Sequence, residues 1–285
     1  MNSPTDNGPI LFVGLGRVGT PIARRLIAAG FPLRVFDNDA TKVAAFEPQH
    51  RADGTKSGTD SDIGRVILCL PDPSSAADLV RAWLRGGPSP GSVIVDLGTM
   101  RPALAQALAA EAGQVGAHYL DAPLSGGQRG AQTGDIVVMV SGDEAAMARM
   151  RPVIETIGST VRYLGSSGRA SLLKSINQFM YISYNLIFAD GLRLADQLGF
   201  GADDALDCLS NGAPRHPLID DRLQAHGAQV FEIQRCVKDL QCFTPAPGFE
   251  SEALALFDIV LMRLKGAVDA GHGSDDILSL SGTWP

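Results

Sequence analysis

The sequence predicts an α/β domain built on a mainly parallel sheet, followed by an all-α domain that a long helix joins to it. Short apolar runs alternate with helical patterns from residue 10 to about 165, and no strand of comparable quality follows. One apolar helical repeat then occupies residues 171–198. Such alternation indicates parallel strands covered by helices. We therefore expect domains at residues 1–165 and 166–285.

The first predicted strand, residues 10–13, leads through a glycine-rich turn into a helix. Gly14, Gly16 and Gly19 follow it with the spacing G-x-G-x-x-G. Gly14 permits a tight turn, Gly16 lets the backbone approach phosphates, and Gly19 allows close packing of the helix. Free N–H groups and the dipole at the helix start attract an anion. The segment predicts a dinucleotide-binding turn of the Rossmann type. Its expected contact residues are Gly14, Leu15, Gly16, Arg17, Val18 and Gly19.

The second predicted strand, residues 33–36, ends at Asp37, about 20 residues past the glycines. A carboxylate at this distance accepts hydrogen bonds from the ribose hydroxyls of NAD and repels the 2′-phosphate of NADP. The neighbouring Asn38 and Asp39 supply no arginine that would reverse this preference. The sequence therefore favours NAD, with NADP the less favoured alternative.

The remaining elements follow from periodicity and turn signals. The expected strands are residues 66–70, 92–96, 118–122, 136–140 and 160–164, with a helix at 144–157. The helix at 171–198 carries polar residues such as Lys174, Asn185 and Asp190 within its apolar repeat, which favours a helix buried between domains over a membrane span. Further helices are expected at 203–209 and 252–270.

Composition narrows the class of protein. The chain has 285 residues and a formal net charge of −7, so no overall basic surface favours nucleic acid. The first nine residues contain no cationic segment followed by an apolar secretory core, and we expect a cytoplasmic protein without a membrane partner. The four cysteines lack C-x-x-C spacing, and the histidines lack metal-motif spacing, so no metal site is predicted.

A second glycine-rich segment, DAPLSGGQRGAQTGD at residues 121–135, directly follows a predicted strand. It therefore lies at the carboxyl edge of the sheet, where open α/β sheets bind ligands. Ser125, Gly126 and Gly127 can offer a hydroxyl and unobstructed backbone N–H groups to a substrate carboxylate. The alternative is a simple connecting loop.

Lys174 and Asn177, with Gln178 beside them, stand near the start of the long helix. Their three-residue spacing places Lys174 and Asn177 on one helix face. A lysine in a partly dry cleft can have a lowered pKa and exchange a proton with a reacting alcohol. The alternative is a solvated surface lysine, against which the apolar surroundings and the glycine turn argue.

Taken in order, these segments resemble the β-hydroxyacid dehydrogenase family, which includes 3-hydroxyisobutyrate dehydrogenase, tartronate semialdehyde reductase and, more distantly, 6-phosphogluconate dehydrogenase. The motifs that carry the resemblance are FVGLGRVG, CLP at residues 69–71, DLGT at 96–99, DAPLSGG, KSINQ at 174–178 and KDL at 238–240. DAPLSGG followed by KSINQ is the specific part, since the glycine turn alone fits many families.

The resemblance implies roles for individual residues. Lys174 is then the catalytic acid/base, and Ser125 and Gly126 hold the substrate carboxylate. Asn177 and Gln178 orient the substrate. The cofactor contacts implied are Leu70, Pro71, Thr99 and Lys238, the last supported by Asp239. Family membership also implies an oligomer, expected here as a homodimer or homotetramer.

Several positions depart from the family pattern. Val18, Arg25 and Gly98 replace a common methionine, asparagine and hydroxyl residue, and Ala170 with Ser171 replaces a glycine–glutamine pair. After KDL, Pro245, Pro247 and Gly248 should end a helix early, with a restart near Ser251. Two roles are open for Arg129, a contact to a second acidic group of the substrate and a position on the surface. His216 fits a loop residue better than a catalyst.

The leading hypothesis is an NAD-dependent oxidoreductase, a 3-hydroxyacid dehydrogenase or reductase. It would transfer a hydride between nicotinamide and a small β-hydroxy acid or its semialdehyde, with Lys174 as general acid/base. One alternative is an oxidoreductase of the imine reductase type. Another is a noncatalytic nucleotide-binding module, against which the set Ser125, Lys174, Asn177 and Lys238 argues.

Overall fold

The computed structural model describes residues 8–52, 63–212, 231–243 and 251–282. The chain divides into two compact units, Met1–Lys174 and Ser175–Pro285. This division falls within helix α7 (Arg169–Gln197), which starts in the first unit and continues in the second.

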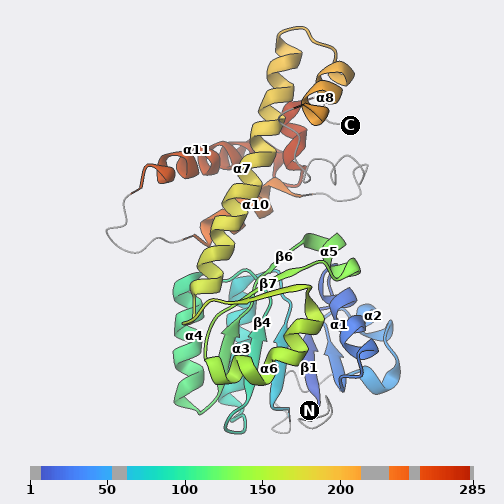
Figure 1. The fold of residues 1–285 in the computed structure, drawn as a ribbon, viewed down its shortest axis with the longest axis vertical. Helices are drawn as coiled ribbons and strands as arrows, with labels where there is room; N and C mark the ends of the chain where they lie inside the picture. Colours follow the sequence, from blue (N-terminus) through green and yellow to red (C-terminus); the bar gives the residue numbers. More distant parts are fainter. Residues whose placement is uncertain (1–7, 53–62, 213–230, 244–250, 283–285) are drawn as a thin grey trace. The chain divides into compact units, whose positions relative to one another are not determined.

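The first unit contains a five-stranded parallel sheet with the order β2-β1-β3-β4-β5 (Figure 1). Ile10 pairs with Leu33 on one side and Arg65 on the other, which fixes the register of the first three strands. Every residue of β1, β3 and β4 is buried, as expected for strands covered on both faces. The strands are β1 (Ile10–Val13), β2 (Leu33–Phe36), β3 (Arg65–Leu68), β4 (Val93–Asp96) and β5 (His118–Asp121).

Helices form the layers around this sheet. They are α1 (Gly19–Ala28), α2 (Ala40–Ala44), the 3₁₀ helix η1 (Pro48–His50), α3 (Pro73–Arg85), α4 (Pro102–Gln114), α5 (Gly127–Thr133) and α6 (Glu144–Ile157). Asp143 caps α6, where its carboxylate accepts a hydrogen bond of 2.7 Å from the N–H of Ala146. Pro73 and Pro102 occupy helix starts, where the missing N–H costs no hydrogen bond.

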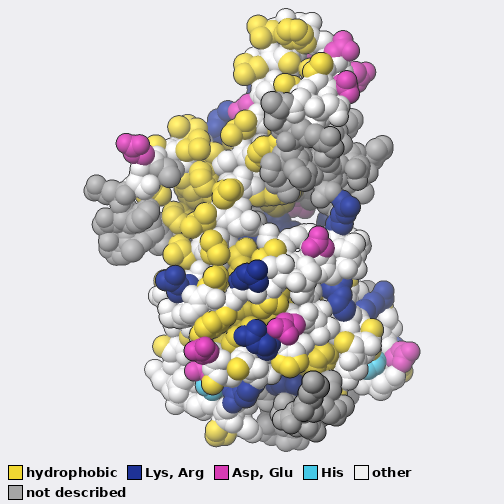
Figure 2. All heavy atoms as spheres, viewed as in Figure 1, with side chains coloured by type: hydrophobic (Ala, Val, Ile, Leu, Met, Phe, Trp, Pro, Cys, Tyr) yellow, Lys and Arg dark blue, Asp and Glu magenta, His cyan; other side chains and the backbone are white. Residues whose placement is uncertain are grey.

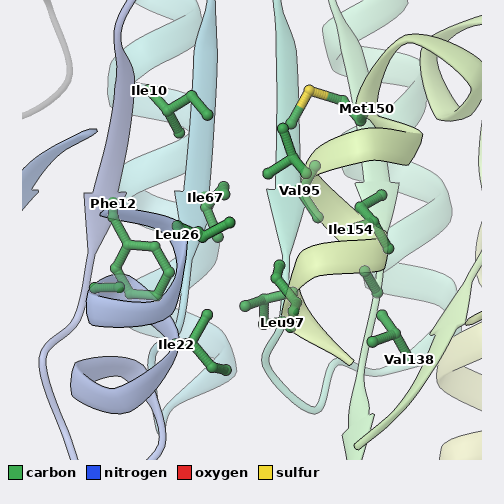
Figure 3. Packing of buried hydrophobic residues seen from close by; sticks show 14 of the residues in the cluster. Ile10, Phe12, Ile22, Leu26, Ile67, Val95, Leu97, Val138, Met150 and Ile154 are labelled. Atoms are coloured by element: carbon green, nitrogen blue, oxygen red, sulfur yellow. The ribbon is translucent and has the colours of Figure 1, made fainter. Parts of the chain in front are cut away.

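Two apolar clusters fill the first unit. One brings together Phe12, Leu26, Val95 and Ile154, and Figure 3 shows these side chains from β1, α1, β4 and α6. The other packs α3 and α4 against the sheet and contains the fully buried Trp83. The sheet is thus covered on both faces, which confirms the α/β class.

A second, three-stranded sheet follows the first along the chain. It consists of β6 (Leu124–Ser125), β7 (Val137–Val140) and β8 (Thr160–Tyr163). β6 pairs antiparallel to β7, and β8 pairs parallel to it. The positions of β7 and β8 were predicted from the sequence, but their separate sheet was not. Periodicity does not reveal which strands pair, and β6, with two residues, is too short to show a periodicity.

The second unit is helical in the part that the structure describes, as predicted. Besides α7 it contains α8 (Ala202–Asn211), α10 (Ile233–Gln241), α11 (Ala253–Ala267), the π-helix η2 (Val268–His272) and the 3₁₀ helix η3 (Ile277–Ser281). Its core includes Ile182, Leu186, Ile233 and Leu264. None of the described helices is both long enough and apolar enough to cross a membrane.

The helix that contains KDL, α10, ends soon after this motif, as expected. α10 stops at Gln241 and the next described helix begins at Ala253, near the predicted restart. Pro245, Pro247 and Gly248, and also His216, lie outside the described residues.

Candidate functional site

The glycine turn after β1 has the geometry that its spacing predicts. Gly14 has φ +102°, and a Cβ there would lie 2.3 Å from the carbonyl oxygen of Cys69. A Cβ on Gly19 would lie 2.0 Å from the carbonyl oxygen of Gly14. Gly16 is exposed, and a Cβ there meets nothing within 4 Å. Two glycines are therefore required by packing, whereas Gly16 leaves open space at the backbone.

The turn lies where the strand order reverses. The chain passes from β1 to β2 on one side and then to β3 on the other side of β1. In open α/β sheets ligands bind outside the carboxyl ends of the strands at this point. Leu70 and Pro71 follow β3 at the same edge, next to Gly14 through the carbonyl of Cys69. The residues present thus fit a dinucleotide, since the backbone of Gly16 is open to a ligand at this edge.

Asp37 is fixed at the end of β2. Its Oδ2 accepts a hydrogen bond of 2.7 Å from the N–H of Leu15, and its Oδ1 accepts one of 2.9 Å from the N–H of Asp39. The Lys42 Nζ lies 3.4 Å from the same Oδ1. The two backbone bonds orient the carboxylate beside the glycine turn. Lys42, only five residues after Asp37, thus adds a cation beside this carboxylate, which was not among the predicted site residues.

Asp96 ends β4 as a buried carboxylate. Its Oδ1 accepts a hydrogen bond of 2.8 Å from the N–H of Gly98, and its Oδ2 accepts one of 2.9 Å from the hydroxyl of Tyr119. Burial raises the pKa of Asp96 to about 6, more than these hydrogen bonds lower it. A Cβ on Gly98 would lie 3.0 Å from Asp96 Oδ1, so glycine suits this position. Half-buried Thr99 follows directly.

The glycine-rich loop after β5 begins with Ser125 in β6, opposite Val137. Gly126 has φ +138°, and a Cβ there would lie 2.7 Å from the carbonyl oxygen of Asp135. Gly127 has φ +58° with open space around it. The loop therefore presents two glycines in conformations that other residues rarely adopt, one of them with an unobstructed backbone. Arg129 is exposed on α5.

Arg25 ties α1 to the end of α5. Its guanidinium donates hydrogen bonds to the carbonyl oxygens of Ala131 (2.7 Å), Gln132 (3.2 Å) and Ile157 (3.0 Å). The last turn of a helix leaves carbonyls without partners in the helix, and a cation there satisfies them. Arg25 was noted in the sequence only as a departure, yet it joins the helix after the glycine turn to the helix after Gly126.

Asp121, at the end of β5, is the site residue that sequence reasoning missed. It is 1% exposed, and its carboxylate accepts four hydrogen bonds, from Ser141, from Gly168 and, twice, from Ser171. Its position as the first residue of DAPLSGG was a signal that it stands at the end of a strand. The partners, 20 to 50 residues away, left no local pattern.

Lys174 and Asn177 lie one turn apart on α7, Lys174 in the first unit and Asn177 in the second. The Lys174 residue is 7% exposed, unlike a solvated surface lysine. In the second unit the amide of Gln178 donates a hydrogen bond of 2.7 Å to Asp239 Oδ2. Asp239 Oδ1 lies 3.7 Å from Lys238 Nζ, which is the pairing expected of a supporting carboxylate.

No group of three or more His, Cys, Asp or Glu side chains in the described ranges is placed to hold a metal ion. No disulfide bond joins any of the four cysteines, Cys69, Cys208, Cys236 and Cys242.

Residues 9–165 match a family described as the NAD binding domain of 6-phosphogluconate dehydrogenase. A relative from Arabidopsis thaliana, named probable 3-hydroxyisobutyrate dehydrogenase-like 1, mitochondrial, is 30% identical over 95% of this chain and 83% of that protein. The fold resembles a solved 3-hydroxyisobutyrate dehydrogenase from Salmonella typhimurium (TM-score 0.82, 24% identity, 97% of this chain and 100% of that one). It also resembles a variant imine reductase from Myxococcus stipitatus in complex with NAD⁺ (TM-score 0.64, 19% identity, 97% and 99%).

Proposed function

The chain belongs to the β-hydroxyacid dehydrogenase family of NAD(P)-dependent oxidoreductases, and we propose that it interconverts a small β-hydroxy acid and its semialdehyde with NAD as cofactor. The observation that carries the proposal is confined to the first unit. The glycine turn follows β1, while Asp121 at the end of β5 holds the start of the helix that carries Lys174. The cofactor turn and the start of the helix that carries the candidate acid/base thus both lie at the carboxyl edge of one sheet.

Lys174 is assigned the proton transfer. In the oxidation, its neutral amine accepts the proton of the substrate hydroxyl, and in the reduction its ammonium returns a proton to the carbonyl oxygen. Bound nicotinamide supplies the hydride acceptor in one direction and the donor in the other. Asn177, on the same face of α7, and Gln178 are assigned to orienting the substrate.

Ser125, Gly126 and Gly127 are assigned to the substrate carboxylate. The hydroxyl of Ser125 and the N–H groups of the two glycines are donors suited to a carboxylate. The positive φ of both glycines supports this assignment, because a side chain at either position would strain the backbone.

The test of the proposed chemistry is the variant Lys174→Ala beside Lys174→Arg, which keeps the charge but cannot act as a base. Both should lose turnover by about 10²- to 10⁴-fold, the typical contribution of a positioned acid/base. NAD affinity should stay within about twofold of the wild type. Steady-state reduction of NAD with a panel of 3-hydroxy acids gives the reference rate. Near-normal turnover of either variant would contradict the assignment.

The preference for NAD rests on Asp37. The two backbone N–H groups that bind its carboxylate support a fixed orientation in which the negative charge repels a 2′-phosphate. The measurement is the ratio of kcat/KM for NAD and NADP with the same acid. A ratio near one would overturn the preference. The remaining cofactor contacts assigned are Leu15, Arg17, Val18, Leu70, Pro71, Thr99 and Lys238.

An imine reductase is the second candidate, because the fold resembles that enzyme class over nearly the whole chain. The two activities separate in one assay, in which cyclic imines and 3-hydroxy acids are offered with the matching form of the cofactor. Cofactor binding without turnover on either class would favour a noncatalytic module.

We also propose that the protein is a homodimer or homotetramer. In the second unit, Met180, Ile187 and Leu194 recur every seven residues along α7 and are each about 60% exposed. Figure 2 shows hydrophobic side chains gathered over this region. A stripe of this kind fits the same helix of a second copy. The molar mass from light scattering tests the proposal, and a monomer would refute it. Cytoplasmic localisation stays a prediction.

A further inference from the structure

The start of α7 has its backbone donors fully satisfied by groups of the first unit. The first N–H groups of a helix have no partner within it. Here the N–H groups of Gly168 and Ser171 donate to the two oxygens of Asp121, each at 3.0 Å. The N–H of Ala170 donates to Ser141 Oγ at 3.0 Å, and that of Arg169 to the carbonyl of Ser166 at 3.3 Å. The first bond within the helix is Leu172 N–H to Gly168 O.

Two hydroxyls complete this cluster. Ser141 Oγ donates to Asp121 Oδ1 at 2.6 Å, and Ser171 Oγ donates to Asp121 Oδ2 at 2.9 Å. All three side chains are buried, with exposures of 0% to 1%. A buried carboxylate with this many donors is held in one orientation, because each displaced donor would leave an unsatisfied polar group.

The backbone around the cluster is equally constrained. Asp121 and Ser141 also exchange two backbone hydrogen bonds, of 2.9 and 3.1 Å. Gly168 has φ +88°, and a Cβ there would lie 2.8 Å from the carbonyl oxygen of Pro102. Gly168 is therefore packed closely between the end of β5 and the start of α4.

We propose that Asp121, Ser141 and Ser171 are positioning residues that fix the rotation and height of the first turn of α7 and thereby present Lys174 to the substrate. This rests on the role of Lys174 in the proposed function. Ser171 precedes Lys174 by three residues, so the two lie on neighbouring turns of one helix face. A displacement of Ser171 is passed to Lys174 with little loss over a single helical turn.

Ser171 contributes two donors to Asp121, its N–H and its hydroxyl. By the family resemblance, it stands where a glutamine is common. Its hydroxyl adds one donor to Asp121 that a backbone N–H alone does not supply. The proposal therefore predicts that the hydroxyl, not the bulk of the side chain, matters at this position.

The experiment compares Ser171→Ala, which removes the hydroxyl, with Ser171→Thr, which keeps it. The control is Ser183→Ala, since the hydroxyl of Ser183 on the same helix is buried and has no hydrogen-bond partner among the described residues. Two quantities are measured in the full-length protein. They are kcat and the KM for NAD, both with an accepted 3-hydroxy acid as substrate, and the rate at which acetic anhydride acetylates Lys174 without substrate, followed by mass spectrometry.

Ser171→Ala should lower kcat by about fivefold, the factor that corresponds to one hydrogen bond of about 1 kcal/mol. KM for the cofactor should stay within about twofold. The acetylation rate of Lys174 should differ from the wild-type rate by a similar factor of about five. Ser171→Thr should restore both kcat and the acetylation rate. Ser183→Ala should leave both at the wild-type value.

Three results would overturn the proposal. One is a Ser171→Ala variant that melts at a lower temperature but keeps kcat and the acetylation rate of Lys174. This result would mean that Ser171 has a purely structural role. Another is a Ser171→Thr variant that behaves like Ser171→Ala. The third is an equal effect of Ser183→Ala. Acetylation needs no turnover, so it tests the positioning of Lys174 even if Lys174→Ala retains activity and the proposed function fails.

Discussion

Alanine at two positions of the glycine turn should separate folding from cofactor binding. The variants are Gly19→Ala and Gly16→Ala, which add the same methyl group three residues apart. At Gly19 the new Cβ would lie 2.0 Å from the carbonyl oxygen of Gly14, whereas at Gly16 it meets nothing within 4 Å. The first substitution should therefore disturb the fold, and the second should disturb only a ligand that approaches the backbone.

The size of the first effect follows from the contact. An ordinary contact begins near 3.4 Å, so the methyl group and the oxygen must separate by about 1.4 Å, and both belong to backbone that the sheet and α1 hold in place. Overpacking of this kind costs about 1–3 kcal/mol or more. For a unit of this size the melting temperature falls by about 2–4 °C per kcal/mol.

Gly16→Ala should leave stability unchanged or raise it by about 0.4–1 kcal/mol, because alanine restricts the unfolded chain and fits the native backbone. Its dissociation constant for NAD should rise by about tenfold, or about 1.4 kcal/mol. Thermal unfolding followed by circular dichroism gives the first quantity, and isothermal titration with NAD gives the second. Normal stability of Gly19→Ala, or undiminished NAD affinity of Gly16→Ala, would refute the reasoning.

Three further perturbations test other parts of the first unit. The pKa of Asp96 is about 6 when folded, above the unfolded value of 3.8, so the folded state keeps a proton that the unfolded state loses between about pH 4 and 6. The free energy of unfolding should therefore fall by up to about 3 kcal/mol as the pH rises from about 4 to 6. Urea unfolding of Asp96→Asn should not show this fall. Arg25→Ala should cost about 1–3 kcal/mol, because three carbonyl oxygens lose a charged donor, and hydrogen exchange should show faster opening of α5. Lys42→Ala removes the cation 3.4 Å from Asp37 and should lower kcat/KM for NADP relative to NAD by up to about fivefold, as exposed ion pairs contribute about 0–1 kcal/mol; an unchanged ratio would exclude a role for Lys42.

The bounds of a helix or strand could be predicted where its own residues determine where it begins and ends. The strand at 10–13 and the helix at 144–157 have the predicted bounds. A buried parallel strand is a continuous apolar run, and the helix starts at a capping aspartate, Asp143. Strand partners are not local, which is why the sheet of β6, β7 and β8 was not separated from the main sheet.

The features of the candidate site likewise fall into those that neighbouring residues predict and those that depend on residues far apart in the sequence. The glycine spacing and Asp37 could be read because a cofactor turn is built from neighbouring residues. The cluster around Asp121 could not, because Ser141 and Ser171 are 20 and 50 residues away and reach it only through the register of β5, β7 and α7. The ion pair of Lys42 with Asp37 could have been predicted from the sequence, because Lys42 is in the short helix α2 that follows Asp37.

Two departures from the family pattern, Arg25 and Ser171, hold elements of the candidate site together rather than change the groups that it contains. Arg25 joins α1 to α5, and Ser171 joins α7 to the end of β5. Each links an element that carries a proposed site group to a neighbour through a buried or half-buried polar contact. Ser125 and Lys174, which carry the proposed chemistry, are unchanged. We therefore expect these departures to affect the rate and stability of the protein more than the class of its reaction.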